Sequence, residues 1–311
     1  MASDRYAGRV AIVTGGGGGL GREYALLIAA GGGRVVVNDL GGDHHGGRQG
    51  SSGPAERVVA EILESGGEAV PDTSDVGEDA GDVVRTAVGA WGRLDLVVNN
   101  AGISGGGLID EISVEDFDRM VDVHYRATVA VCRAAWPVLR GAGYGRIVNT
   151  SSGSTMGLPG SSAYISAKAA VMGLTRALAF DGAPHGIKVN AVMPIALTRL
   201  TRQIPSARFR DFLDQHFPPA AVAPFVGALL SEEVPCSGET FSVGAGIAAR
   251  VGLATVPGYV ARRPEVEDYL ANFDQVMALE GVWMPGGSME EVEFRAHQLG
   301  VELRRPTFEE G

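Results

Sequence analysis

RVAIVTGGGGGLG, residues 9–21, joins a β-branched apolar run to a glycine-rich turn, and a helical stretch from Arg22 to Ala30 follows. The apolar run predicts a buried first strand. A glycine-rich turn between a strand and a helix lets backbone N–H groups approach a pyrophosphate, which the helix N-terminus also attracts. Five consecutive glycines fit almost any glycine pattern, so a merely flexible turn is the alternative. The expected phosphate-binding residues are Gly15, Gly19, Leu20 and Gly21.

An acidic residue follows at the spacing of a dinucleotide site. The run from Arg34 to Asp39 predicts a second strand, and Asp39 lies 20 residues after Gly19. At that spacing a carboxylate accepts hydrogen bonds from the hydroxyls of the adenosine ribose. The same charge repels a 2′-phosphate, so the sequence favours NAD over NADP. The alternative is that Asp39 is only a turn residue at the end of a strand.

Strand and helix patterns alternate along most of the chain, which predicts an α/β fold with one doubly wound parallel sheet of the Rossmann type. We expect residues 1–246 to form an NAD-binding catalytic domain and residues 247–311 a helical C-terminal extension packed on it. Further strands are expected at 68–71, 94–98, 146–150, 188–192 and 238–243, and helices at 54–65, 79–91, 114–139 (kinked or broken around Pro137), 265–279 and 289–299.

Small and polar residues follow several of these strands, at the edge of an open parallel sheet where ligands lie. We expect Asp75, beside Val76, to reach the adenine amino group. Thr198, a short distance after Pro194, could hydrogen-bond the carboxamide of a nicotinamide. Asn100, Ala101 and Gly102 end another strand and complete the expected cofactor-binding set.

Tyr164 and Lys168 stand four residues apart in a stretch that reads as helical. At that spacing both side chains lie on one helix face. A neighbouring ammonium favours the phenolate and lowers the tyrosine pKa from about 10, which would make Tyr164 usable as an acid or base. Ser152, just after an apolar strand, could hold the oxygen of a substrate. Only Lys168 and Lys188 among 26 basic residues are lysine, which suggests that Lys168 has a particular role.

Composition excludes several classes of function. The 311 residues carry a formal net charge of -11, which argues against nonspecific nucleic-acid binding. Two cysteines, Cys132 and Cys236, form neither a disulfide framework nor a zinc pattern, so no metal is expected and a reducing compartment is favoured. No signal segment or membrane-spanning apolar run is visible, and we therefore expect a cytoplasmic protein without membrane contact.

Taken together, the motifs resemble those of the short-chain dehydrogenase/reductase family. The match comprises Thr14-Gly15-x-x-x-Gly19-x-Gly21, Asp75, Asn99-Asn100-Ala101-Gly102, Ser152, Tyr164-x-x-x-Lys168 and Asn190-Ala191-Val192-x-Pro194. The resemblance implies that Tyr164 is the general base and that Ser152 holds the substrate oxygen. It also implies that Lys168 lowers the Tyr164 pKa and binds the nicotinamide ribose. Because the interval to Tyr164 is one residue shorter than usual, Ser151 is an alternative to Ser152.

His124 stands where this family usually has an asparagine on the helix before the serine strand. It could anchor a water relay from Lys168, or it could be a structural histidine. The family also implies a homodimer or homotetramer through the long helices that contain His124 and Tyr164.

A closer resemblance is to the dehydrogenase unit of the peroxisomal multifunctional enzymes of fatty-acid β-oxidation. It is carried by Val37-Asn38-Asp39-Leu40-Gly41-Gly42-Asp43, Tyr144-Gly145-Arg146-Ile147-Val148 and Phe241-x-Val243-Gly244-Ala245-Gly246. It implies NAD-dependent oxidation of a (3R)-hydroxyacyl-CoA to a 3-ketoacyl-CoA, so the expected partner is a small-molecule acyl thioester. Two alternatives remain: a dehydrogenase of steroids or other bulky secondary alcohols, and a non-catalytic cofactor-binding protein.

Overall fold

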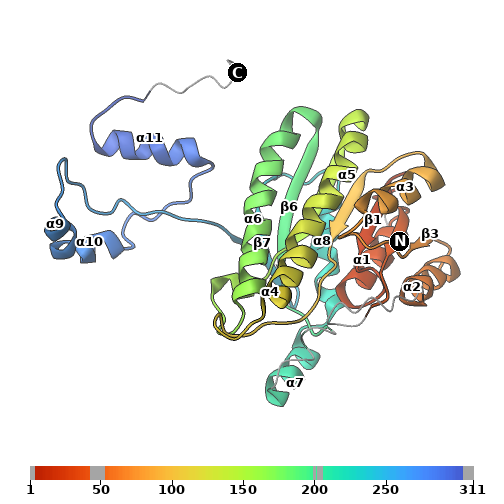
Figure 1. The fold of residues 1–311 in the computed structure, drawn as a ribbon. Coiled ribbons are helices and arrows are strands. Elements are labelled where there is room, and N and C mark those ends of the chain that lie inside the picture. Colours follow the sequence, from red (N-terminus) through yellow and green to blue (C-terminus); the bar gives the residue numbers. More distant parts are fainter. Residues whose placement is uncertain (1–3, 43–52, 199–200, 202–205, 304–311) are drawn as a thin grey trace. The chain divides into compact units, whose positions relative to one another are not determined.

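An eight-stranded sheet in the order β3-β2-β1-β4-β5-β6-β7-β8 forms the centre of the first of two compact units (Figure 1). The computed structural model describes residues 4–42, 53–198, 201 and 206–303. Strands β1 to β7 pair in parallel, as the sequence predicted. The strands are β1 (Val10–Thr14), β2 (Arg34–Asn38), β3 (Glu68–Asp72), β4 (Leu96–Asn99), β5 (Gly145–Thr150), β6 (Ile187–Pro194), β7 (Thr240–Gly244) and β8 (Ile247–Val251).

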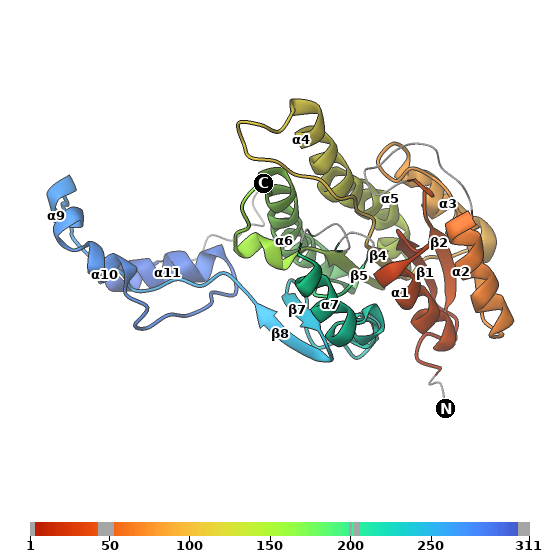
Figure 2. The ribbon, with the colours of Figure 1, turned by 90° about the horizontal axis from the view of Figure 1, so that it is seen from below.

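Helices cover both faces of this sheet (Figure 2). Alternate residues of β1 belong to two separate cores: Ala11 and Val13 pack with α1, α2 and α8, whereas Val10 and Ile12 pack with α3 and α5. This division follows from the two-residue period of a strand buried on both faces. The helices of this unit are α1 (Gly19–Ala30), α2 (Gly53–Glu64), α3 (Ala80–Trp91), α4 (Val114–Val121), α5 (Ala127–Ala142), α6 (Ser162–Gly182), α7 (Ala207–His216) and α8 (Ala223–Leu230). Short 3-10 turns lie at η2 (Gly153–Met156), η3 (Ala183–His185) and η5 (Pro219–Ala221).

The long helix is not broken at Pro137, and the alternative of a kink there stays a prediction. Pro137 lies inside α5, where the buried Ala135 and Leu139 on either side hold the helix against the sheet. The irregular turn lies earlier, at η1 (Asp122–Arg126), a single π-helical turn between α4 and α5. Such turns place a side chain differently from its neighbours and are frequent at functional sites.

Strand β8 was not predicted from the sequence. A two-residue turn connects it to β7, with Ala245 and Gly246 both at positive φ (51° and 77°). Turns of this length join antiparallel strands. Four of the five residues of β8 are exposed, so no alternation of apolar and polar residues marks it.

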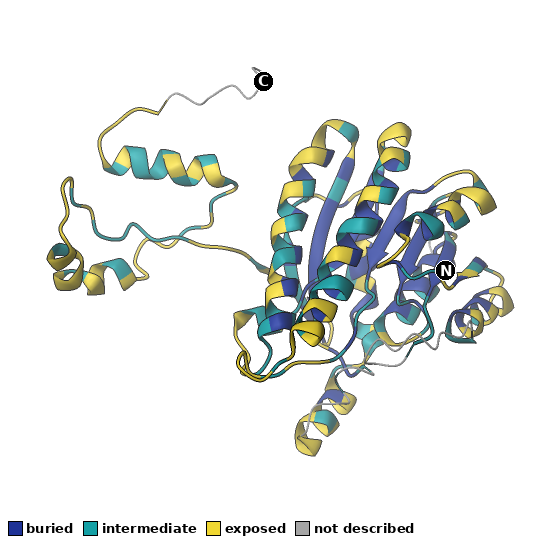
Figure 3. Cartoon of the chain, viewed as in Figure 1, coloured by how far each residue is buried: buried dark blue, intermediate teal, exposed yellow. Residues whose placement is uncertain are grey.

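The second unit, Val251–Gly311, contains α9 (Val266–Ala271), α10 (Phe273–Met277) and α11 (Ser288–Gln298). The single helix expected at 265–279 is interrupted at Asn272, whose side-chain amide donates to the Asp268 carbonyl and so competes with a backbone N–H. None of the residues in these three helices is buried (Figure 3). The boundary predicted after Gly246 and the packing of the extension on the first unit stay predictions. Within the described residues, no helix is long and apolar enough to cross a membrane.

Candidate active site

The glycine-rich turn leaves β1 at the carboxyl edge of the sheet and opens α1. Gly18 precedes the helix without a side-chain cap, and the first turn of α1 holds no acidic residue. Gly17, Gly18, Gly19 and Leu20 of this turn help to line a cavity of 580 Å³. The N-terminus of α1, with the positive end of the helix dipole, suits a phosphate.

The end of β4 is joined to this turn by hydrogen bonds. The Asn100 amide donates to the carbonyls of Thr14 and Gly15 over 3.0 and 3.1 Å. In return, the Thr14 hydroxyl accepts the backbone N–H groups of Asn100 and Ala101. Because these bonds fix both segments, Gly15, Ala101 and Gly102 lie together at one wall of the site, where the sequence expected them.

Asp39 lies at the junction of two cavities, the one described above and a second of 660 Å³. Its carboxylate accepts the N–H of Gly17 over 3.0 Å and the N–H of Gly41 over 2.8 Å. An ionised carboxylate offers about four acceptor positions, so it can still accept ribose hydroxyls. Asp75 and Val76 line the second cavity, while the Asp75 carboxylate accepts the N–H of Gly77.

Tyr164 and Lys168 both lie on α6 and line the 580 Å³ cavity together with Ser152. The Ser152 hydroxyl lies near enough to Tyr164 to lower the pKa of its phenol. The Lys168 Nζ donates to the Thr150 carbonyl over 2.6 Å and stands 5.9 Å from the centre of the Tyr164 ring. The structure thus brings together the three residues that the sequence selected for catalysis.

The pKa values in this group differ from the sequence expectation. Burial raises the pKa of the Tyr164 phenol, and the nearby Ser152 hydroxyl opposes that rise. Burial also lowers the pKa of the Lys168 amine to about 7. Lys168 therefore does not depress the Tyr164 pKa as expected, because its amine is directed at Thr150 and is itself removed from water.

The geometry favours Ser152 over Ser151 as the serine beside the tyrosine. The Ser151 side chain is 1% exposed and its hydroxyl donates to the Lys168 carbonyl over 2.9 Å. Ser152 instead contacts Tyr164 and accepts the N–H of Ser154 over 3.2 Å. Ser151 thus anchors α6 to the sheet, and Ser152 presents its hydroxyl to the cavity.

His124 lies in the π-helical turn η1 with its ring edge-on to Tyr164, 4.9 Å between ring centres. Its Nε2 is 2.9 Å from the Ile103 carbonyl oxygen, and its buried Nδ1 has no hydrogen-bond partner among the described residues. Burial and the nearby charge of Lys168 hold the pKa of His124 well below its usual value. A Cβ on Gly102 would meet the ring at 2.7 Å, so Gly102 leaves the space that this histidine fills. The proposed water relay stays a prediction.

Thr198 and Pro194 line the same cavity, as the carboxamide assignment requires. The backbone N–H of Thr198 donates to the Thr201 hydroxyl over 2.6 Å, which fixes the segment after β6. The contact of Thr198 with a nicotinamide stays a prediction. Among the described residues, no group of three or more His, Cys, Asp or Glu side chains is placed to hold a metal ion.

A sequence model of the short chain dehydrogenase family matches residues 9–208, which include the glycine turn, Ser152, Tyr164 and Lys168. The chain belongs to this family. Residues 209–311 lie beyond the match.

Known members of the family resemble the chain over different lengths. The mouse peroxisomal multifunctional enzyme type 2 is 42% identical over 261 residues, which are 83% of this chain and 35% of the mouse protein. The structure of the full-length enzyme of that name from Drosophila melanogaster superposes with a TM-score of 0.78 at 30% identity, covering 95% of this chain and 50% of that one. The structure of 7α-hydroxysteroid dehydrogenase complexed with NADH and 7-oxo glycochenodeoxycholic acid gives 0.70 at 27% identity, over 79% of this chain and 96% of that one. The chain therefore spans about a third of the length of the mouse relative.

Several residues of the site were not selected from the sequence. The Thr150 carbonyl binds Lys168, and the Ile103 carbonyl binds His124. Both are backbone atoms that any residue type would supply. Pro54 and Arg57 line the cavity beside the glycine turn. Their position in the first turn of the helix after β2 is the signal that could have indicated them.

Proposed function

We propose that this short-chain dehydrogenase interconverts a secondary alcohol and a ketone with NAD, and that its substrate is a 3-hydroxyacyl thioester oxidised to the 3-ketoacyl thioester. The single observation that carries the proposal is that Tyr164, Ser152 and Lys168 line one cavity together with the open N-terminus of α1. That arrangement gives a carbinol a base and a hydroxyl partner, and gives a dinucleotide a place for its phosphates.

The residues present fit a nicotinamide dinucleotide. Gly17 to Leu20 would hold the pyrophosphate, Asp39 the adenosine ribose, and Lys168 the nicotinamide ribose. The carboxylate of Asp39 supports NAD over NADP, because a 2′-phosphate beside it would meet a like charge. When bound, NAD supplies the hydride acceptor and a positive charge near the phenol.

The chain's own residues handle the proton. Ser152 would hold the carbinol oxygen, and the deprotonated oxygen of Tyr164 would accept the carbinol proton and become the phenol. Since burial raises the Tyr164 pKa, the phenolate needs positive charge nearby to form readily. The Lys168 amine, with a pKa of about 7, can bind or release a proton near neutral pH. Proton transfer of this kind contributes on the order of 10²–10⁴-fold to rate.

Two relatives support different substrates. The likeness to the peroxisomal multifunctional enzymes supports an acyl thioester, and the more distant likeness to a hydroxysteroid dehydrogenase supports a bulky alcohol. We favour the thioester because that likeness extends over 95% of the chain in the Drosophila comparison.

The test is the rate at which NADH or NADPH forms from 3-hydroxyacyl thioesters and from hydroxysteroids. We expect thioester oxidation with NAD, at a kcat/KM at least about tenfold above that with NADP, which corresponds to about 1.4 kcal/mol. A higher kcat/KM for hydroxysteroids than for thioesters would overturn the proposed substrate class but leave the proposed reaction in place. No reduction of either cofactor by any alcohol would contradict the proposal.

We also propose a homo-oligomer in a reducing compartment, with the cytoplasm as the expected location. Both cysteines are free thiols, and the buried Cys132 is hydrogen-bonded to Asn99. Sedimentation of the purified protein and localisation of a tagged chain in its source cell test these two statements separately.

A further inference from the structure

Two loops beside the active-site cavity hold each other in place. The first follows β4, and the second connects β5 to α6. The Gly107 N–H donates to the Gly160 carbonyl over 2.9 Å, and Gly107 pairs with Ser161 as an isolated parallel bridge. A Cβ on Gly106 would come within 2.5 Å of the Gly160 oxygen, so only glycine allows this approach. The two loops therefore form one continuous surface.

This surface is apolar although it faces solvent. Leu108 is 50% exposed, Ile109 71%, Met156 71% and Leu158 52%. We call these four residues the apolar rim. Exposed apolar residues that occur singly need no explanation, but a group of them on two joined loops beside a cavity marks a binding surface. Figure 3 shows exposed loops at the end of the molecule where α6 begins. Tyr164 is the third residue of that helix.

One residue of the rim, Leu158, lines the cavity that contains Tyr164 and Ser152. Leu158 lines that cavity together with Ser154 and Ser161, and Met156 lies two residues before it. The cavity has a volume of 580 Å³, which is the size of a site for one small molecule. Because a dinucleotide would already extend from Gly19 to Tyr164, a long substituent on the carbinol carbon must leave the cavity, and it would leave past Leu158.

We propose that the apolar rim binds the hydrocarbon chain of the substrate, so that the enzyme prefers acyl chains long enough to reach from Tyr164 across Leu158 and Met156 to Leu108 and Ile109. This inference rests on the proposed function for the position of the carbinol. The four rim side chains are apolar, which suits a hydrocarbon chain, and the exposed Asp110 and Glu111 that follow Ile109 would repel the phosphates of a nucleotide. Each methylene fully removed from water improves affinity about fourfold, and an open rim would give a smaller factor.

Binding measurements test the rim without requiring turnover. Calorimetric titration in the presence of NAD would use the butanoyl and decanoyl members of the 3-ketoacyl N-acetylcysteamine thioesters, which lack the nucleotide of coenzyme A. We expect the protein to bind the decanoyl compound on the order of 30-fold more tightly than the butanoyl compound. In the double variant Met156→Ser with Leu158→Ser, this ratio should fall below about fivefold, with butanoyl binding nearly unchanged.

Two further variants make the result specific. Leu63→Ser is the matched control, because Leu63 is 54% exposed on α2 and lies outside both loops. It should keep the ratio of the unaltered protein. Gly106→Ala should separate the loops through the clash with Gly160 and lower the ratio without removing any rim side chain.

The rim proposal is overturned if the unaltered protein binds both thioesters equally, or if the double variant keeps the full ratio. A preserved ratio in a protein that oxidises no alcohol would instead contradict the proposed function and leave the rim as a chain-binding surface. Equal losses of butanoyl and decanoyl affinity in the double variant would also overturn the proposal, because the rim would then contact the common part of the two ligands.

Discussion

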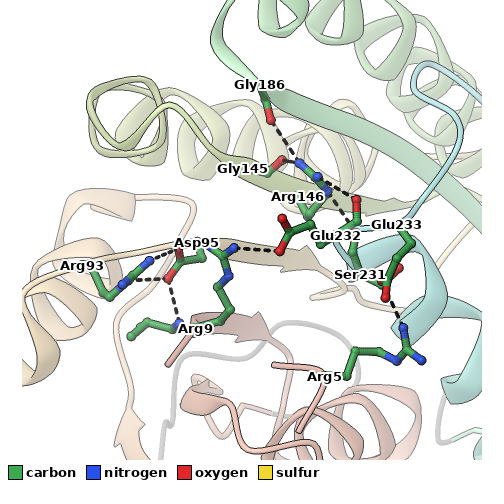
Figure 4. Close-up of polar contacts among 11 residues, drawn as sticks. Arg5, Arg9, Arg93, Asp95, Gly145, Arg146, Gly186, Ser231, Glu232 and Glu233 are labelled. Atoms are coloured by element: carbon green, nitrogen blue, oxygen red, sulfur yellow. Dashed lines mark hydrogen bonds and ion pairs between the residues drawn. The ribbon is translucent and has the colours of Figure 1, made fainter. Parts of the chain in front are cut away.

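The two edges of the sheet differ in whether their buried polar groups have hydrogen-bond partners. At the amino edge, the fully buried Asp95 accepts hydrogen bonds from Arg9, Arg93 and the N–H of Val10 (Figure 4). At the carboxyl edge, Asn99 Oδ1, Thr150 Oγ1 and His124 Nδ1 are buried without a hydrogen-bond partner among the described residues. A buried polar atom left without a partner costs about 1–3 kcal/mol, so the second arrangement persists at the expense of stability.

At the amino edge, buried side chains connect several segments of the chain through hydrogen bonds. Arg146 is 4% exposed and donates to the carbonyls of Gly145, Gly186, Ser231 and Glu232. Its guanidinium and that of Arg9 lie over the Tyr144 ring, 4.3 and 3.7 Å from the ring centre. Every group there has a protein partner, which leaves nothing for a ligand. The comparison teaches that the polar groups at the carboxyl edge are less fully paired than those at the amino edge. A partnerless atom alone does not mark the site, because the Tyr24 hydroxyl in the core also lacks a partner among the described residues.

The largest expected effect is on activity at the carboxyl edge. Tyr164→Phe should lower kcat/KM for the alcohol on the order of 10²–10⁴-fold, because it removes the proton acceptor. NAD binding, measured by fluorescence titration, should stay within about threefold. The matched control is Tyr24→Phe, since the Tyr24 hydroxyl is buried in the core with no hydrogen-bond partner among the described residues. If both variants lost activity equally, a general effect on the fold would explain the loss.

The next largest effect is on stability at the amino edge. Asp95→Ala should lower the free energy of unfolding by about 3–5 kcal/mol, because it leaves the N–H of Val10 and two guanidinium groups without their buried acceptor. Denaturant unfolding measures the loss, and kcat/KM per folded molecule should change by less than about twofold. A large loss of kcat/KM in the folded fraction would show that the two edges are not independent.

A smaller effect is expected where the cofactor meets the glycine turn. Asp39→Asn should weaken NAD about tenfold and allow NADP to be used, since it removes the charge while keeping an acceptor for the N–H of Gly17. The KM values for both cofactors measure the change. An unchanged ratio of the KM values for NAD and NADP would show that another residue distinguishes the two riboses.

The smallest effect is expected for an exposed ion pair at the amino edge. Glu232 pairs with Arg9 over 3.3 Å, but its side chain is 74% exposed. Glu232→Gln should therefore change the free energy of unfolding by less than about 1 kcal/mol. A loss as large as that of Asp95→Ala would mean that exposure does not separate the two kinds of ion pair.

Patterns of local sequence were enough to predict the parallel sheet and most of the site. The valine-rich strands, the glycine turn and the Tyr164–Lys168 spacing each depend on residues close in the chain, and all were placed correctly. The interruption at Asn272, the exposed strand β8 and the π-helical turn at His124 were missed. Each depends on which hydrogen bonds compete in three dimensions, and the periodicity of the sequence does not record that competition.

The pKa values of the site show the same limit. The spacing of Tyr164 and Lys168 was correct, but the direction of the Tyr164 pKa was not, because burial raises it more than the nearby Ser152 hydroxyl lowers it. Burial of both groups follows from the packing of α6 on the sheet and from the bond of Lys168 to Thr150. The sequence motif predicts which residues lie together, whereas their pKa values depend on burial, which only the packed structure shows.

The most direct test of the opposition between the edges is the free energy of unfolding of the unaltered protein and of Lys168→Met, measured together with turnover at several pH values. Burial lowers the pKa of Lys168 from 10.5 to about 7, so the unfolded chain binds more protons than the folded one between those values, and the stability of the unaltered protein should rise with pH across that window. Lys168→Met lacks this rise. We predict that it loses turnover by at least about 100-fold yet is as stable as the unaltered protein or more so near pH 7, with the advantage shrinking as the pH rises. A variant that is much less stable near pH 7, or that keeps its turnover, would contradict the account.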